Sequence, residues 1–150
     1  MSYERENHDG HDDHDGSRFR MRLPSPLPDD VEKVMTRVID CAMDVHRALG
    51  PGFLESIYHK AMCIALDRAG LSFECEKPIA VFYEGIALNG QRVDLVVGNV
   101  VVVELKAVIR FEQIHRAQVI SYLKTMSLRA GLLVNFRVPL LHQGIQRIVL

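Results

Sequence analysis

The sequence lacks any long apolar run: none of its 150 residues lies in an apolar stretch approaching the ~18 residues that suggest a membrane-spanning helix. The basic-then-apolar pattern of a secretory signal is also missing from the N-terminal stretch. These absences predict a cytoplasmic protein without a membrane segment. A composition of 48% hydrophobic and 25% charged residues is ordinary for a globular domain that buries a sizeable core.

Cysteine is scarce. Cys41, Cys63 and Cys75 are the three cysteines of the chain, and no two of them have CxxC spacing. An odd number without that spacing argues against a disulfide framework and against a zinc site. Three thiols also fall short of the four cysteine ligands that an iron–sulfur cluster usually needs. We therefore expect buried free thiols.

An excess of basic charge is missing too. The net charge is -1, with six acids and three bases in residues 1–20 and thirteen acids and fourteen bases in residues 28–150. A nearly neutral body provides no broad basic surface. Any binding of nucleic acid must therefore depend on a local site.

Two parts are expected along the chain, a disordered His/Asp-rich tail with a linker over residues 1–27 and a folded domain over residues 28–150. The tail is polar and charged, with almost nothing to bury. Within it, His8, His11 and His14 recur every three residues. A solvated tail and a metal-chelating tail are the two interpretations. Asp29 or Asp30 can cap the helix that follows the linker.

Hydrophobic periodicity predicts seven elements and a short last strand. Helices are expected over about 30–49, 53–69 and 112–126, the first of them ending at Gly50-Pro51-Gly52. Strands are expected over 72–84, 86–97, 100–105 and 129–135, with a short one over 144–150. The order α-α-β-β-β-α-β indicates an α/β domain in which helices pack on a mixed β-sheet.

Two carboxylates and a lysine lie on consecutive predicted strands, in the segment VDLVVGNVVVVELK. Asp94 is on the first strand, and Glu104 and Lys106 are on the second. Carboxylate oxygens hold divalent cations that polarise a phosphate and generate hydroxide from water. A nearby lysine can orient that water and offset developing charge. This combination is typical of phosphodiester hydrolysis.

The connection between these strands decides whether the three groups meet. If Gly98-Asn99 were a simple two-residue turn, Asp94 would oppose Val103, and Glu104 would point to the other face of the sheet. A three-residue connection, Gly98-Asn99-Val100, places Asp94 opposite Glu104 instead, and Lys106 shares that face. We predict the odd register, with a bulge or an odd-numbered loop.

Charge burial favours a function for these residues. Glu104 ends a strongly apolar run, where an unpaired charge is costly. Lys106 could compensate it alone, as a structural ion pair. Asp94 has similarly apolar neighbours, however, and two carboxylates on one face repel each other unless a cation or a proton lies between them. The pair therefore favours a bound metal.

The pattern of Asp94 followed by Glu104-Leu105-Lys106 resembles the PD-(D/E)XK nuclease superfamily, and GFLESIY at 52–58 resembles the motif of its GxxExxY family. The likeness extends over roughly residues 30–150 and includes LGPGFLESIY, VDLVV, VVVELKAV, HRAQVISYLK and GLLVNF. Val93 stands where the superfamily name has proline. The resemblance implies a restriction-endonuclease-like fold and a divalent-metal-dependent nuclease.

The resemblance also implies roles for individual residues. Asp94 and Glu104 would bind Mg²⁺ or Mn²⁺, with the Leu105 carbonyl as a further ligand. Lys106 would position or activate the attacking water. Glu55 would be an additional acid at the metal. It alternatively stabilises the start of its helix, where acids are favourable.

Three residues of the predicted helices would support the site. Gln118 and Tyr122, four residues apart, resemble the Q-x-x-x-Y motif that follows the lysine in RecB-like nuclease domains. They could hydrogen-bond the site or a phosphate, or simply belong to the polar side of an amphipathic helix. His115 lies on the same stripe of the helix. Tyr58, three residues after Glu55, would be a supporting hydrogen-bond group or a core residue.

The first functional hypothesis is a metal-dependent nuclease that acts on nucleic acid, with DNA favoured over RNA, and two copies could pair to cut two strands. The alternative is a catalytically weak or inactive nuclease-fold module that binds nucleic acid or protein. The small size and the near-neutral body motivate this alternative. A metal-chelating protein that acts through its histidine tail is the third class.

Overall fold

The computed structural model describes residues 25–150, and the predicted tail with His8, His11 and His14 lies outside these residues. The elements are α1 (Asp29–Leu49), α2 (Glu55–Arg68), β1 (Phe73–Tyr83), β2 (Ile86–Val97), β3 (Val101–Lys106), α3 (Gln113–Met126), β4 (Ala130–Asn135), the 3-10 helix η1 (Leu141–Gly144) and β5 (Ile145–Val149). This order confirms the predicted α/β arrangement and the short last strand.

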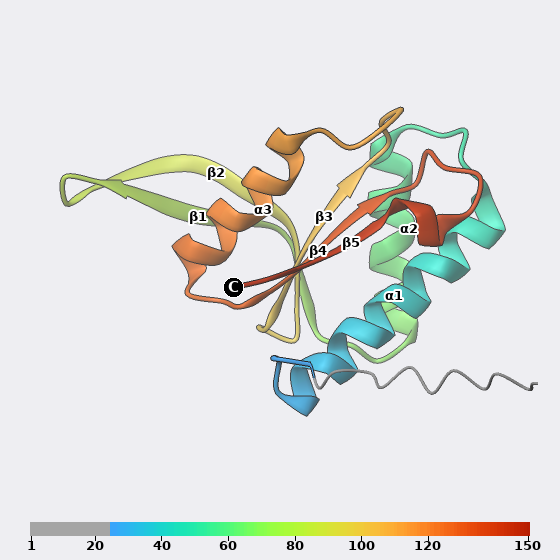
Figure 1. The fold of residues 1–150 in the computed structure, drawn as a ribbon, viewed down its shortest axis with the longest axis horizontal. Coiled ribbons are helices and arrows are strands. Elements are labelled where there is room, and N and C mark those ends of the chain that lie inside the picture. Colours follow the sequence, from blue (N-terminus) through green and yellow to red (C-terminus); the bar gives the residue numbers. More distant parts are fainter. Residues whose placement is uncertain (1–24) are drawn as a thin grey trace, which may run out of the picture.

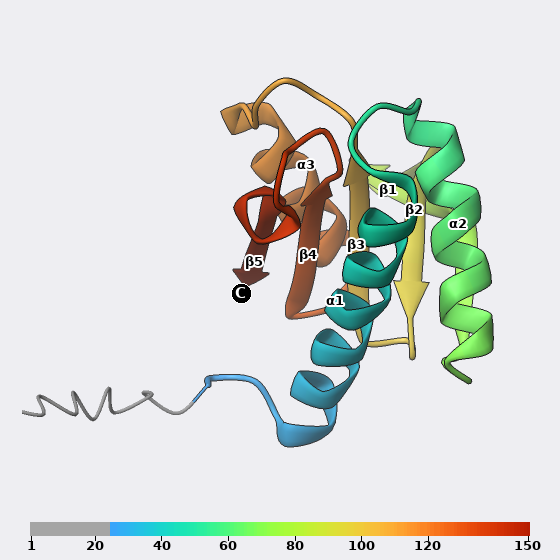
Figure 2. The same ribbon diagram turned by 90° about the vertical axis from the view of Figure 1, so that its right-hand side faces the viewer.

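The five strands form one mixed sheet in the order β1-β2-β3-β4-β5. Neighbours are antiparallel except for β3 and β4, which are parallel. A parallel pair needs a crossover connection, and α3 supplies it. In Figures 1 and 2, α1 and α2 cover one face of the sheet while α3 covers the other.

Alternation along β3 divides the core between these two faces. Val101, Val103 and Leu105 pack with the residues of α1 and α2, whereas Val102 packs with those of α3. All four side chains are fully buried. A strand covered on both faces needs apolar residues at every position, which explains the uninterrupted valine run. Glu104 is the exception, because alternation directs its side chain inward toward α3.

The connection between α1 and α2 is held by Tyr58. Its hydroxyl donates a hydrogen bond to the Gly50 carbonyl and accepts one from the Phe53 N–H at 3.1 Å. The ring stacks on Phe136, with 4.4 Å between the ring centroids. Tyr58 therefore combines the two predicted roles: it is a buried core residue, and its hydrogen bonds close the turn that begins α2.

The predicted cap of α1 is wrong. The helix begins at Asp29, its N-cap position is Pro28, and no side chain caps it. Asp29 and Asp30 instead lie in the first turn, where negative charge interacts favourably with the helix dipole.

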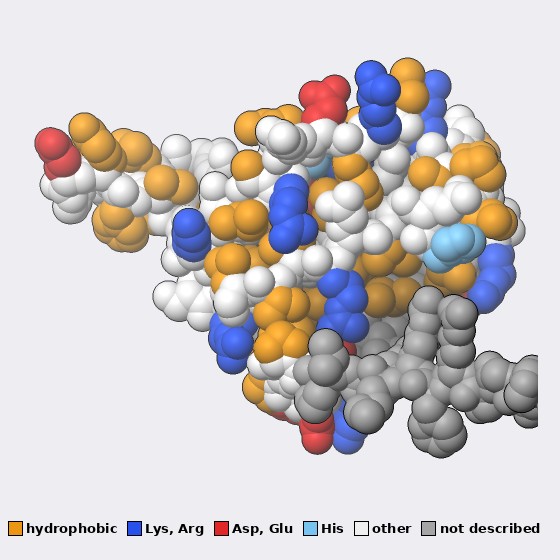
Figure 3. All heavy atoms as spheres, in the orientation of Figure 1, with side chains coloured by type: hydrophobic (Ala, Val, Ile, Leu, Met, Phe, Trp, Pro, Cys, Tyr) orange, Lys and Arg blue, Asp and Glu red, His pale blue; other side chains and the backbone are white. Residues whose placement is uncertain are grey.

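The hairpin of β1 and β2 projects beyond the helices (Figure 1). Its tip exposes large apolar side chains, among them Phe82, Tyr83 and Ile86, and Figure 3 shows this apolar end. Between residues 25 and 150, no helix has both the length and the apolar character needed to cross a membrane.

Candidate functional site

The turn between β2 and β3 has the odd length that brings Asp94 to Glu104. Val97 pairs with Val101, so Gly98, Asn99 and Val100 form the connection. Gly98 and Asn99 have φ values of 59° and 58°, and the Val100 N–H donates to the Val97 carbonyl at 3.2 Å. A left-handed two-residue turn is thus followed by one inserted residue, Val100. The predicted odd register is confirmed.

The two strands separate immediately beyond this paired segment. Pairing ends at Leu95 and Val103, and the Asp94 carboxylate accepts a hydrogen bond from the Leu105 N–H at 2.9 Å. The N–H and C=O of one strand residue point to the same side of the strand. The Leu105 carbonyl therefore faces the same gap as the Asp94 carboxylate, while the next carbonyl, that of Lys106, accepts from Phe136 on the β4 side.

Glu104 is a buried carboxylate that is only half satisfied. Its Oε1 lies 3.3 Å from the Lys106 Nζ, whereas its buried Oε2 has no hydrogen-bond partner among the described residues. Burial, followed by the charge of Asp94, raises the pKa of Glu104 to about 8. An ion pair with Lys106 alone thus leaves one buried oxygen without a partner, which is costly.

The donor atoms of these neighbouring residues suit a divalent cation. Asp94, Glu104 and the Leu105 carbonyl present only oxygen atoms, which are the ligands that Mg²⁺ and Mn²⁺ prefer. A cation in the gap would satisfy Glu104 Oε2 and relieve the repulsion between the carboxylates.

Glu55 approaches the gap from the first turn of α2. Burial raises the pKa of its carboxyl group, the ammonium of Lys106 opposes this shift, and the Asp94 carboxylate adds to it. Glu55 also lines a cleft of about 650 Å³ together with Asp94, His59 and Glu76. It therefore both begins a helix, as the alternative interpretation expects, and faces the predicted site.

Tyr122 approaches from the opposite face, on α3. Its hydroxyl accepts hydrogen bonds from the Gln118 side chain at 2.7 Å and from the Gln91 side chain at 2.8 Å. Burial and then the charge of Glu104 raise the pKa of this hydroxyl. Gln118 thus reaches Tyr122, and no hydrogen bond joins it to the carboxylates within residues 25–150.

Gln91 is a hydrogen-bond partner of the candidate site that the sequence analysis missed. It lies on β2, 31 positions before Tyr122, and a single polar residue in a hairpin gives no signal of its tertiary partner. His115 does not join the site: its Nδ1 accepts from the Glu112 N–H at 3.0 Å and completes a capping box at the start of α3.

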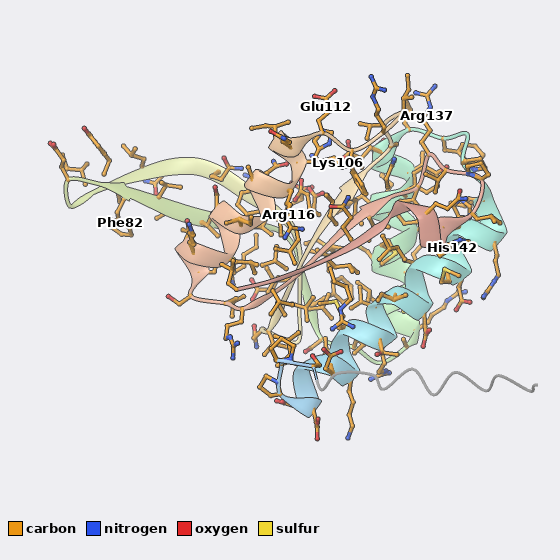
Figure 4. All side chains as sticks on the ribbon, viewed as in Figure 1. Phe82, Lys106, Glu112, Arg116, Arg137 and His142 are labelled. Carbon is orange, nitrogen blue, oxygen red and sulfur yellow. The ribbon has the colours of Figure 1, made fainter. Side chains whose placement is uncertain are left out.

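A cleft of about 670 Å³ continues from Glu55 along the α1–α2 turn and is lined by Arg137 and Ala107. Figure 4 shows Arg137 and Glu112 extending from the same end of the molecule as Lys106, with Phe82 at the far tip of the hairpin. Arg137 is exposed, so a positive side chain is available beside the candidate site for a phosphate backbone.

Comparison with known families identifies the fold. The pattern of the PD-(D/E)XK nuclease superfamily matches residues 32–148 of the chain. The chain belongs to the PD-(D/E)XK nuclease superfamily. Membership supports a nuclease-type function and a nucleic-acid substrate, and PD-(D/E)XK nucleases generally use divalent metal ions. No curated protein and no solved structure matches the chain.

The expectation of three buried thiols is wrong for this PD-(D/E)XK domain. Cys41 is buried, but Cys63 is only partly buried and Cys75 is exposed. Cys63 and Cys75 moreover lie close to each other and to His59, although they are twelve positions apart. Sequence spacing carried no signal of this cluster because α2 and β1 bring it together.

Proposed function

We propose that the protein is a divalent-metal-dependent nuclease that hydrolyses phosphodiester bonds in DNA. The observation that carries this proposal is the unpartnered buried Glu104 Oε2 beside the Asp94 carboxylate and the Leu105 carbonyl. Such an arrangement is unfavourable for two ionised carboxylates unless a cation lies between them, and the superfamily is one of nucleases.

Mg²⁺ or Mn²⁺ would be held by Asp94, Glu104 and the Leu105 carbonyl, with Glu55 as a further carboxylate. When bound, the ion supplies a Lewis acid for the phosphate and lowers the pKa of a bound water. The other roles belong to the residues of the chain. The oxygen donors position the ion, and the low exposure of Glu104 excludes bulk water from one side of it.

Lys106 is placed to act on the attacking water and the phosphate. Its side chain is 15% exposed, so the ammonium is shielded yet reachable. It donates hydrogen bonds, orients the water and offsets the negative charge that develops on the phosphate. Glu55, which lines the adjoining cleft together with Asp94, would bind the ion or accept a proton from that water.

Tyr122 is proposed as an orienting group. Because its oxygen accepts from both Gln91 and Gln118, its own proton remains available to a phosphate oxygen or a water. The two amides hold the hydroxyl on the side of the sheet that Glu104 faces.

We further assign the chain to the GxxExxY family. The arrangement of the three motif residues supports this assignment. Tyr58 closes the turn that contains Gly52, and this turn places Glu55 at the cleft. We also propose that the protein works in the cytoplasm and that two copies pair to cut both strands of a duplex.

A cleavage panel tests the nuclease. The full chain is incubated with single- and double-stranded DNA and RNA, with Mg²⁺, with Mn²⁺ and with a chelator. We expect metal-dependent cleavage of DNA, and we expect Lys106→Ala to lower its rate by roughly 100-fold or more, the typical loss when one transition-state donor is removed. Lys124→Ala, an exposed lysine on α3, is the matched control and should cut at the wild-type rate.

Circular dichroism melting checks that Lys106→Ala remains folded. Cleavage at the wild-type rate by that folded variant would refute the role of Lys106. If the wild type cuts nothing and isothermal titration with Mg²⁺ or Mn²⁺ gives the same absence of binding for wild type and Asp94→Ala, the chain is instead the inactive binding module.

A further inference from the structure

We propose that His59, Cys63 and Cys75 form a second metal site, which takes a thiophilic transition-metal ion of the Zn²⁺ class and lies beside the carboxylate site. One ring nitrogen of His59 and the sulfur atoms of Cys63 and Cys75 all lie within 4.8 Å of one another. Neither the nuclease proposal nor superfamily membership uses these residues.

The separations suit a tetrahedral ion. Zn²⁺ binds sulfur at about 2.3 Å and nitrogen at about 2.0 Å, so the edge of a tetrahedral site is about 3.8 Å. Ligand atoms within 4.8 Å of each other thus need to move inward by about 1 Å at most. Rotation of exposed or partly buried side chains covers such a distance, and the exposure of Cys75 provides a route for the ion.

The secondary structure brings the three ligands together. His59 and Cys63 are four residues apart on α2 and so lie on one face of that helix. Cys75 comes from β1, which runs beside α2. Two thiolates and an imidazole select Zn²⁺, Cu⁺ or Fe²⁺ over Mg²⁺, in contrast to the oxygen donors around Glu104. Three protein ligands leave a fourth position for water.

The backbone of β1 is distorted at this cluster. Cys75 pairs with Leu95 and Lys77 pairs with Val93, but the intervening pair of Glu76 with Asp94 is missing, and Glu76 has a φ of 49°. Regular alternation would send adjacent side chains to opposite faces. The left-handed Glu76 instead lets two neighbours face α2: Cys75 approaches Cys63, and the Glu76 Oε1 lies 3.5 Å from the His59 Nε2.

His59 is oriented as metal-binding histidines commonly are. Its Nε2 lies 3.2 Å from the Asp94 carbonyl oxygen, and because a carbonyl only accepts hydrogen bonds, Nε2 carries the hydrogen. In the neutral imidazole the lone pair is then on Nδ1, which would be the nitrogen that binds the ion. Histidine ligands typically donate their other ring N–H to a carbonyl or a carboxylate, and Asp94 and Glu76 provide one of each.

The same hydrogen bond connects the two sites. Asp94 presents its carboxylate to the gap between β2 and β3 and its carbonyl to His59. An ion that fixes His59 would therefore also fix the segment of β2 that positions the Asp94 carboxylate.

Cobalt titration of the full chain tests the proposal. The reduced, metal-stripped protein is titrated with Co²⁺ under nitrogen, with excess Mg²⁺ present to occupy the carboxylates. We expect one equivalent of Co²⁺ to give a near-ultraviolet thiolate-to-cobalt charge-transfer band that Zn²⁺ then removes. Oxygen and histidine ligands, including those of the tail, do not give this band.

Matched variants assign the ligands. The double variant Cys63→Ser/Cys75→Ser should lose the band, and Glu76→Ala, which removes a partner of His59, should weaken Co²⁺ binding by roughly 10-fold or more. Cys41→Ser changes the third cysteine, on α1, and should leave the titration unchanged. Glu104→Ala should also keep the band, because Glu104 belongs to the proposed nuclease site. The second metal site is thus tested independently of the nuclease proposal.

X-ray absorption at the zinc edge of the wild type provides a second measurement that needs no variant. It should show two sulfur neighbours at about 2.3 Å. The proposal is overturned if no thiolate band forms at any Co²⁺ concentration, if the band survives in the folded double variant, or if zinc has only oxygen and nitrogen neighbours.

Discussion

At the scale of single residues, Glu104 combines two opposing demands. Folding buries its side chain almost completely, with 5% exposed, yet one of its oxygens has no partner in the described chain. The unpaired oxygen therefore lowers the stability of the metal-free fold, and a functional cation at this position would restore that stability. Residues that break the rules of core packing in this way are characteristic of functional sites.

The pKa of Glu104 predicts a pH dependence of stability. The carboxyl titrates at about 8 in the folded chain, against an ordinary value of 4.5, so the folded state retains a proton that the unfolded state has released. This stabilising contribution is complete below the ordinary value and is lost as pH rises through about 8. The free energy of unfolding of the metal-free protein should fall by up to about 1.4 kcal/mol per pH unit between pH 6 and 8.

Urea denaturation in the presence of a chelator measures this slope. Glu104→Gln cannot titrate and should have a flatter pH profile than the wild type, whereas Glu84→Gln, at the exposed hairpin turn, should follow the wild type. Saturating Mg²⁺ should also flatten the wild-type profile. Parallel profiles for wild type and Glu104→Gln would show that Glu104 does not keep its proton in the fold.

At the scale of elements, the position of α3 depends on Gly131 in β4. A Cβ atom at this glycine would lie 2.6 Å from the Val119 Cγ1 and 3.2 Å from the Leu123 Cδ1. The first contact is far below van der Waals distance, and a β-branched side chain on a helix has little freedom to move away. The absent side chain thus lets α3 approach the sheet and brings Tyr122 near Glu104.

We therefore expect Gly131→Ala to lower the free energy of unfolding by about 1–3 kcal/mol through overpacking, and to lower the cleavage rate because α3 shifts. Chemical denaturation measures the first effect. Val119→Ala removes the clashing Cγ1 atom, so the double variant should lose less stability than the sum of the two single changes. If the two stability losses simply add, the contact between residue 131 and Val119 is not the source of the strain.

At the scale of the whole molecule, residues 25–150 contain one set of predicted catalytic residues, on one chain. Cutting both strands of a duplex in one encounter needs two such sets, which a C2-symmetric pair supplies. We expect sedimentation velocity to find a species of twice the 17.0 kDa chain mass, at least in the presence of duplex DNA.

The apolar tip of the β1–β2 hairpin is a candidate dimer interface, and a substitution there tests it in the same sedimentation experiment. Phe82 is 68% exposed, so Phe82→Ser should change the stability of the monomer by no more than about 0.5 kcal/mol. Weaker pairing in this variant would place the tip in the interface, and unchanged pairing would place the interface elsewhere. A wild-type chain that sediments only as a monomer, with and without DNA, contradicts the predicted dimer.

Much of the fold was predictable because it depends on local pattern. Helical periodicity, the valine run of β3 and the glycine-containing turns act over a few residues, and they led to the observed element order. Counting residues around Gly98 and Asn99 left two registers open, and the odd one was predicted because it is the register in which Asp94 and Glu104 meet.

The sequence by itself thus determined the elements and placed Asp94, Glu104 and Lys106 on neighbouring strands, while the pairing of Val97 with Val101 decided that Asp94 lies opposite Glu104. Only the tertiary structure decided that Gln91 reaches Tyr122, that Tyr58 serves the core, and that Cys63 and Cys75 adjoin His59. These contacts depend on how helices pack across a twisted sheet and on the left-handed backbone at Glu76. Such packing joins residues distant in sequence, and no local periodicity encodes which of them will touch.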